Sequence, residues 1–290
     1  MSSPRQSPAP LPDFIVIGAV KAATTWIAHQ LRQHPSIYMP QPEPHYFSTE
    51  FGHGIDWYRG WFAGAGAGQR IGEKSADYLA HEEAPRRIAT LLPQIPLIVQ
   101  LRNPVERAYS DYCMLFRRGT VTKDPHHYLE RMDSEQPRFL KDGLYARHLA
   151  RYLDYFPPEQ IKVILHDDIR NTPEAVIADV CRHIGVSLHI APQEVRARKN
   201  DRETPLLPLS LRRLLSPAKP IVQPLRDNAW FRIVRSSLAR PVRYPPLTDD
   251  LRDRLRDYYA EDVARLARMI GRDLTPWLAP RRPAGVPEAA

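Results

Sequence analysis

Three short apolar runs, each followed by a segment with helical spacing, most strongly limit what this chain can fold into. The runs are Phe14–Ile17, Leu97–Leu101 and Ile161–Leu165. Phe14–Ile17 is continuous rather than alternating, as is typical of a strand buried on both faces of a parallel sheet, and the other two runs, interrupted only by Gln100 and Lys162, also predict strands. Strands that alternate with helices predict an α/β fold with a central parallel sheet flanked by helices. The 290 residues suit one large domain of this kind or two small ones.

Capping residues mark the ends of several helices. Asn103, Pro104 and Glu106 occupy the N-cap, first and third positions of a helix that follows the second apolar run. A later helix ends near Gly185, where glycine provides the C-cap. The last helix ends at Gly271 and carries one buried stripe. The residues of this stripe are Leu251, Leu255, Tyr258, Asp262 or Val263, Leu266 and Ile270.

The charge balance indicates an anionic partner. Lys and Arg number 41 against 33 Asp and Glu, a formal net charge of +8, which favours a nucleotide, a polyanion or a membrane surface. The two cysteines, Cys113 and Cys181, form no CxxC pair, which argues against a disulfide framework or a zinc site. We expect both to be reduced thiols in the core.

The predicted domain spans residues 13–279. Residues 1–12 are rich in Pro and Ser and lack the apolar core of about 7–15 residues that a signal peptide needs, so we expect a disordered lead. Residues 280–290 predict a loose tail, and the stretch 196–246, rich in Pro, Arg and Leu, predicts an irregular excursion over the active site. No window reaches the roughly 18 apolar residues of a membrane span. We therefore expect a soluble, cytoplasmic protein, and the sequence leaves its oligomeric state open.

The loop after the first strand has the composition of an anion site. Backbone N–H groups and the positive helix end meet there, Lys21 adds a charge, and Thr24 and Thr25 add donors. The alternative is an ordinary helix start, capped by a threonine, with Lys21 in solvent. The ATP-binding pattern GxxxxGK[ST] is not met, and Arg102 stands where such proteins carry a metal-binding aspartate. A sulfuryl group carries a single negative charge, so lysines and backbone donors can handle it without a metal.

Two segments resemble the donor-binding segments of sulfotransferases that use 3'-phosphoadenosine 5'-phosphosulfate (PAPS). They read "IVIGAVKAATTWI" and "LRNPVERAYSDY". Further stretches are similar to the heparan sulfate N-sulfotransferase domain and 3-O-sulfotransferase branch of that superfamily: "EPHYF", "GIDWY", "EKSADYLAHEEAPRRIATLLP", "GLYARHLARYLDYF", "RYPPL" and "LTPWL". They keep the family order over roughly residues 13–278. The resemblance implies a P-loop nucleotide-kinase-like sulfotransferase fold with no bound metal.

The resemblance also implies where the donor binds. The loop from Lys21 to Trp26 would wrap the 5'-phosphosulfate, with Lys21 near the bridging oxygen as a catalytic residue. Arg102 with Ser110 would bind the 3'-phosphate, although a serine in a helix otherwise faces solvent by default. The family's Lys-Gly-Arg donor run is replaced here by "SSLARPVRYP". The implied donor-binding residues are Lys21, Ala22, Ala23, Thr24, Thr25, Trp26, Arg102, Ser110, Arg240 and Arg243. Ala23 stands where the family usually has glycine, so the backbone there must accommodate a Cβ.

Three further residues match the family's catalytic positions. Glu43 would be the general base that takes the acceptor proton, although a lone glutamate in a Pro-rich loop is usually solvated. His45 would support the transition state or the acceptor. Lys74 would face the sulfuryl group, with a salt bridge to a surface carboxylate as the alternative.

The acceptor and two competing functions stay open from the sequence. A glycan, a lipid-linked sugar or a small metabolite would each offer a hydroxyl or amino group. A small-molecule kinase on a related fold is one competing function, and a non-catalytic polyanion-binding module is the other. No recognised nucleic-acid-binding signature occurs in the chain.

Overall fold

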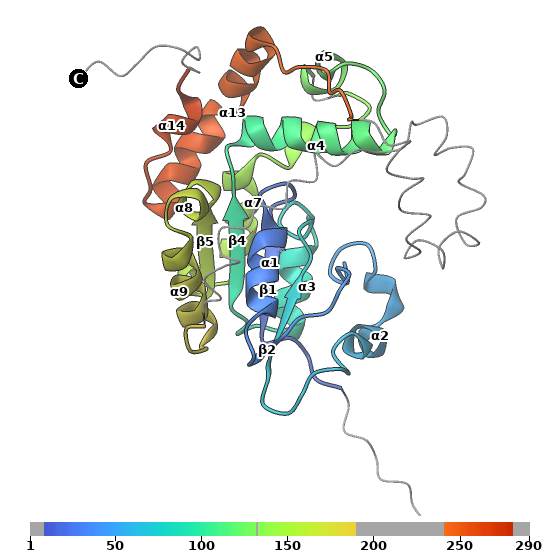
Figure 1. Cartoon of the computed structure of the whole chain (residues 1–290), viewed down its shortest axis with the longest axis vertical. Helices are drawn as coiled ribbons and strands as arrows, with labels where there is room; N and C mark the ends of the chain where they lie inside the picture. The colour runs from blue at the N-terminus through green and yellow to red at the C-terminus, as the bar shows by residue number, and fades with distance from the viewer. Residues whose placement is uncertain (1–8, 132, 190–240, 281–290) are drawn as a thin grey trace, which may run out of the picture.

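The computed structural model describes residues 9–131, 133–189 and 241–280, and these form an α/β fold around one five-stranded sheet (Figure 1). All strands are parallel and lie in the order β2-β3-β1-β4-β5. The strands are β1 (Phe14–Gly18), β2 (Ile37–Tyr38), β3 (Arg70–Lys74), β4 (Leu97–Leu101) and β5 (Ile161–Leu165). Strands β2 and β3 lie on one side of β1. After β3 the chain crosses to the other side of β1, where β4 and β5 lie. Parallel sheets bind ligands where the strand order reverses in this way.

Helices cover both faces of the sheet (Figure 1). Their bounds are α1 (Thr24–Arg32), α2 (Ile55–Gly60), α3 (Ala84–Leu91), α4 (Pro104–Arg118), α5 (Pro125–Leu129), α6 (Arg138–Lys141), α7 (Tyr145–Leu153), α8 (His166–Asn171), α9 (Pro173–Ile184), α13 (Asp249–Ile270) and α14 (Thr275–Leu278), with short 3-10 turns at Phe51–His53 and Pro158–Gln160. In the described part of the chain, no helix is both long and apolar enough to cross a membrane.

The run Phe14–Ile17 is buried on both faces, as predicted. Phe14 and Val16 of β1 point into a cluster with α1 and α9, whereas Ile15 and Ile17 point into a larger cluster that includes α3, α4, α7 and α13. Because successive side chains of a strand point to opposite faces, a continuous apolar run fills two cores at once. Both cysteines are buried free thiols, which confirms that expectation.

The predicted helix ends are confirmed. The Asn103 side chain accepts hydrogen bonds from the N–H groups of Val105 and Glu106 at 3.0 and 3.4 Å, which fixes the start of α4. Gly185 and Gly271 adopt left-handed φ values of 72° and 64° at the ends of α9 and α13.

The sequence did not predict the strands β2 and β3. Strand β3 reads Arg-Ile-Gly-Glu-Lys, a composition that lacks an apolar run. Gly72 fits here because a Cβ would lie 2.2 Å from the Phe14 ring of the neighbouring strand. Glu73 is fully buried, and among the described residues it accepts hydrogen bonds from the hydroxyl groups of nearby Ser75 and Tyr78 and of Tyr58 in α2. Tertiary contacts therefore create this strand.

The stripe on α13 differs from the prediction at Tyr258, and the predicted Ile270 at its end is also only partly buried. Tyr259 and Val263 are buried, while Tyr258 is only partly buried. Steps of four residues from Leu251 continue through Tyr259, so the predicted Tyr258 was wrong by one residue. Asp262, on the edge of the stripe, accepts hydrogen bonds from the first backbone N–H groups of α7, at Ala146 (3.0 Å) and Arg147 (3.1 Å).

Most of the residues predicted to form the lead, the tail and the excursion cannot be compared with the structure. The predicted tail, most of the predicted lead and most of the 196–246 excursion lie outside the described residues. They stay predictions.

Candidate active site

The loop between β1 and α1 is held against β4. The Ala19 N–H donates to the Gln100 carbonyl at 2.8 Å, and the Gln100 side-chain amide donates to the Ala22 carbonyl. Lys21 and Ala23 have φ values of 66° and 67°, a conformation that is uncommon for residues with a Cβ. Ala23 is the N-cap of α1 and the helix has no side-chain cap. The alternative of an ordinary helix start capped by a threonine is therefore wrong.

The N-terminus of α1 presents several groups that an anion could meet. Lys21 and Trp26 are partly exposed, Thr25 is exposed and Thr24 is buried. The first N–H groups of a helix have no acceptor within the helix and carry its positive dipole end. This end of α1 has the charge and the donors that an anion site needs, and the assignment of its residues to a particular donor stays a prediction.

Three cationic residues lie at or just after the carboxyl ends of three adjacent strands. Lys21 lies in the loop after β1, Lys74 ends β3 and Arg102 follows β4. Because β3, β1 and β4 are paired in parallel, their carboxyl ends meet at one edge of the sheet. Ser110 lies on α4, the helix that follows Arg102. It is only 6% exposed, so the solvent-facing alternative is wrong for this residue.

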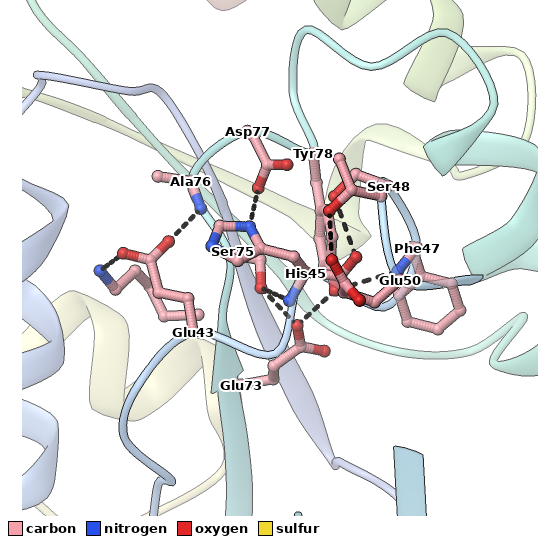
Figure 2. A network of polar contacts seen from close by, with 12 residues as sticks. Glu43, His45, Phe47, Ser48, Glu50, Glu73, Ser75, Ala76, Asp77 and Tyr78 are labelled. Carbon is pink, nitrogen blue, oxygen red and sulfur yellow. Dashed lines mark hydrogen bonds and ion pairs between the residues drawn. The ribbon is translucent and has the colours of Figure 1, made fainter. Parts of the chain in front are cut away.

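Glu43 is engaged through both of its carboxylate oxygens. Its Oε1 pairs with the Lys74 ammonium group, and its Oε2 accepts a hydrogen bond from the Ala76 N–H at 2.9 Å (Figure 2). The Lys74 side chain is 7% exposed and that of Glu43 is 29% exposed. Lys74 does form a salt bridge, which was the alternative to a catalytic role. Its partner is Glu43, however, which is itself a predicted catalytic residue. The fold thus joins two predicted site residues that are 31 positions apart.

His45 is fixed in the same loop by a carboxylate. Its Nδ1 lies 2.7 Å from Asp77 Oδ1, and its backbone N–H donates to Ser75 Oγ at 2.9 Å (Figure 2). The hydrogen bond with Asp77 raises the pKa of His45, although burial opposes the shift. His45 has a φ of 55° and so occupies the left-handed region. Since Nδ1 faces Asp77, Nε2 is the ring nitrogen that a substrate would meet.

Glu73 lies beneath this loop and links its parts. Its Oε1 accepts hydrogen bonds from Ser75 Oγ at 2.8 Å and from the Tyr78 hydroxyl at 2.6 Å (Figure 2). Tyr58 donates to its Oε2. The Tyr78 hydroxyl also accepts from the Phe47 N–H at 3.1 Å. Burial raises the pKa of Glu73 to about 7, against the lowering effect of the three hydroxyl donors. The loop that carries Glu43 and His45 is therefore linked, through Ser75 and Tyr78, to a buried carboxyl with a raised pKa.

Glu73→Gln should stabilise the protein at pH 8 and change its stability little at pH 5. The folded-state pKa of Glu73 is above its ordinary value, so its contribution is complete below about pH 4.5 and is lost as the pH rises toward 7. A rise of the pKa from 4.5 to about 7 corresponds to about 3 kcal/mol of stability, which the neutral glutamine would keep at high pH. Urea unfolding at both pH values measures the difference. Glu159→Gln, at an exposed acid, is the control, and an equal pH response in both variants would contradict the prediction.

Glu43, His45 and Asp77 are also the candidate metal ligands among the described residues. One ligand atom from each lies within 4.8 Å of the others. Lys74 already neutralises Glu43, so this cluster has a charge partner of its own. The metal-free reaction stays a prediction.

The predicted 3'-phosphate site lies within a network of charges. Arg102 is 3.8 Å from Glu106, and Glu106 also pairs with Arg252 from α13. Arg243 is exposed. Two residues later, the Pro245 carbonyl accepts a hydrogen bond from the Tyr109 hydroxyl of α4 at 2.8 Å. The residues after Arg243 therefore lie against the helix that carries Ser110. Arg240 lies outside the described residues.

Sequence reasoning missed Glu73, Asp77 and Gln100. Asp77 follows a strand that was not recognised, so its position at the sheet edge was hidden. The signal for Gln100 was visible, since it is the one polar residue in the run Leu97–Leu101.

Comparisons with known proteins agree with this geometry. The family described as "Sulfotransferase domain" matches residues 11–204. The chain is 30% identical to bifunctional heparan sulfate N-deacetylase/N-sulfotransferase 3 of Mus musculus, over 92% of this chain and 31% of the relative. It is 28% identical to heparan sulfate glucosamine 3-O-sulfotransferase 6 of Homo sapiens, over 90% of this chain and 72% of the relative. The chain thus spans about a third of the length of the bifunctional relatives.

A solved structure shows the same fold. A sulfotransferase from Alicyclobacillus acidocaldarius superposes with a TM-score of 0.68 at 27% identity, covering 92% of this chain and 99% of the other. The family match includes four of the segments that build the site: the loop after β1, the loop carrying Glu43, and the ends of β3 and β4. From this match and the shared fold, the chain belongs to the sulfotransferase domain family.

Proposed function

We propose that this chain transfers a sulfuryl group from PAPS to a hydroxyl or amino group of an acceptor. The observation that carries the proposal is the meeting of Lys21, Lys74 and Arg102 at one sheet edge, with Glu43 bound to Lys74. Cations at that edge suit a donor with a phosphosulfate at one end and a 3'-phosphate at the other. The family supports PAPS as the donor.

The reaction we propose is a single in-line displacement. Glu43 takes the proton from the acceptor O–H or N–H as that atom attacks sulfur, and the bond from sulfur to the bridging oxygen of the phosphosulfate breaks. The products are the sulfated acceptor and 3'-phosphoadenosine 5'-phosphate (PAP). Lys21 stabilises the charge that develops on the bridging oxygen, and Lys74 faces the sulfuryl oxygens.

Lys74 has to change partner in this reaction. Its ammonium group pairs with Glu43 in the structure, and a lysine-bound carboxylate is a weak proton acceptor. We propose that the negatively charged donor draws Lys74 away and so frees Glu43. Catalytic hydrogen bonds often reach their working geometry only with substrate bound.

The acceptor we propose is a glycan, a lipid-linked sugar or a small metabolite. The relatives' names point to heparan sulfate, a glycan. A screen with sulfur-labelled PAPS against these three acceptor classes tests the proposal, with Mg²⁺-ATP as a parallel donor. Label transfer supports a sulfotransferase, phosphoryl transfer from ATP would favour the kinase, and salt-sensitive polyanion binding without any transfer would favour a binding module.

Arg102→Ala should weaken PAP binding by about ten- to a hundredfold. A charge-assisted contact to the 3'-phosphate contributes on the order of 1.5–3 kcal/mol, and its loss leaves that phosphate unpaired. Binding of AMP, which lacks the 3'-phosphate, should change much less. Calorimetric titration with both nucleotides measures the effect. Arg182→Ala, at a 76% exposed arginine on α9, is the control. Equal affinity of the wild type for PAP and AMP would overturn the assignment.

A further inference from the structure

Gln100 is a fully buried amide beneath the loop that joins β1 to α1. It lies between Val99 and Leu101 in β4 and has no exposed surface. Its Nε2 donates to the Ala22 carbonyl, while its Oε1 is buried and lacks a hydrogen-bond partner among the described residues. Burying an amide with one unsatisfied oxygen is unfavourable, and the neighbouring positions hold apolar side chains. The residue therefore points to a role in the loop rather than in the core.

The loop that Gln100 contacts has a conformation that would otherwise relax. Ala23 has a φ of 67°, which the Cβ of an L-residue disfavours. Rotation of the Ala22–Ala23 peptide by half a turn would return this φ to a negative value, as happens between turns of types II and I. The same rotation would pull the Ala22 carbonyl away from Gln100. The hydrogen bond from Gln100 thus opposes the relaxation.

The orientation of this peptide decides where one N–H group points. In a planar trans peptide the C=O and N–H bonds point in opposite directions. The Ala22 carbonyl points down to β4, so the Ala23 N–H points away from β4, toward the open N-terminus of α1. We propose that Gln100 is a positioning residue, whose amide holds the Ala22–Ala23 peptide so that the Ala23 N–H binds the 5'-phosphate of the donor. This inference rests on the proposed donor site.

Gln100→Leu keeps the size of the side chain and removes its amide. If the peptide relaxes, only a fraction of molecules keeps the binding orientation, and the apparent affinity falls by that fraction. We expect PAP to bind about five- to thirtyfold more weakly, the ratio that matches the left-handed penalty of a single residue. Adenosine 3'-monophosphate lacks the 5'-phosphate, so its affinity should change by less than about twofold. Gln100→Met, unbranched and of similar length, is the second variant should the first fold poorly.

A second substitution separates positioning from packing. Ala23→Gly in the Gln100→Leu background should recover most of the lost PAP affinity, because glycine adopts positive φ without penalty. Ile98→Val, at a fully buried residue on the same face of β4 as Gln100 but two positions earlier, is the control and should leave both affinities unchanged. Loss of packing alone would weaken both nucleotides and would not be rescued by glycine in the loop.

The experiment is calorimetric titration of PAP and adenosine 3'-monophosphate into the wild type and these variants. Selective loss of PAP affinity, with recovery by Ala23→Gly, supports the inference. If the wild type binds PAP and the Gln100 variants bind it equally well, or lose both nucleotides alike, the inference alone fails. If the wild type does not bind PAP, the proposed donor site is wrong and the inference fails with it.

Discussion

Glu43→Gln should lower kcat by about 10²–10⁴-fold and change the dissociation constant for PAP by less than about threefold. Glutamine keeps the size of the side chain and its hydrogen bond from Ala76, but it cannot take the acceptor proton. Binding of the donor does not require that proton transfer, so the two effects should separate. Single-turnover transfer from labelled PAPS to the acceptor found in the screen, beside calorimetric titration of PAP, measures both.

Glu50→Gln provides the matched control for this experiment. Glu50 is a partly exposed acid in the same loop and pairs with His53 rather than with a predicted catalytic residue. Its substitution should leave turnover within about twofold of the wild type. Near-native turnover of Glu43→Gln would instead identify another base. His45 would then be the first candidate, because Asp77 already orients its ring.

Lys21→Ala should reduce turnover and donor affinity together. The ammonium group meets the phosphosulfate before the reaction and meets more charge as the bridging oxygen leaves. We expect PAP to bind about ten- to a hundredfold more weakly and kcat to fall by about 10²–10³-fold. The same titration and single-turnover assays check this result.

Lys162→Ala is the control for the charge itself. Lys162 lies on β5, pairs with Asp179 at 2.9 Å and is 32% exposed. Its loss lowers the net charge by the same amount, so unchanged affinity in this variant would show that Lys21 acts by position. Equal losses in the two lysine variants would attribute the effect to overall charge and would remove Lys21 from the site.

The sequence predicted the parts of the fold that local rules determine. The bounds of β4 and β5 and the N-cap Asn103 follow from apolar runs and capping chemistry, which depend on neighbouring residues. Strand β3 could not be predicted in this way. Its buried Glu73 is stable only because Tyr58, Ser75 and Tyr78 meet it in the folded state.

The candidate site divides in a similar way. The resemblance supplied Glu43 and Lys74 as single residues, but their mutual contact depends on how the loop after β2 folds back onto the end of β3. Asp77 and Gln100 were missed because each contacts the site only through another residue, His45 and Ala22 respectively. These contacts follow from the fold: the sequence shows Gln100 as the one polar residue of its run, but not which residue it contacts.

The contact between α13 and α7 has a consequence for the order in which the chain can fold. Asp262 caps α7 from 116 residues downstream, and Tyr259 on the same helix donates to the Leu140 carbonyl at 2.9 Å. During synthesis, α7 lacks this cap and the apolar surface around it stays uncovered until α13 has left the ribosome. The family match ends at residue 204, well before α13 begins. The part of the chain that matches the family model is therefore shorter than the unit that folds, and a nascent chain that ends at residue 204 would expose to chaperones the surface that α13 later covers.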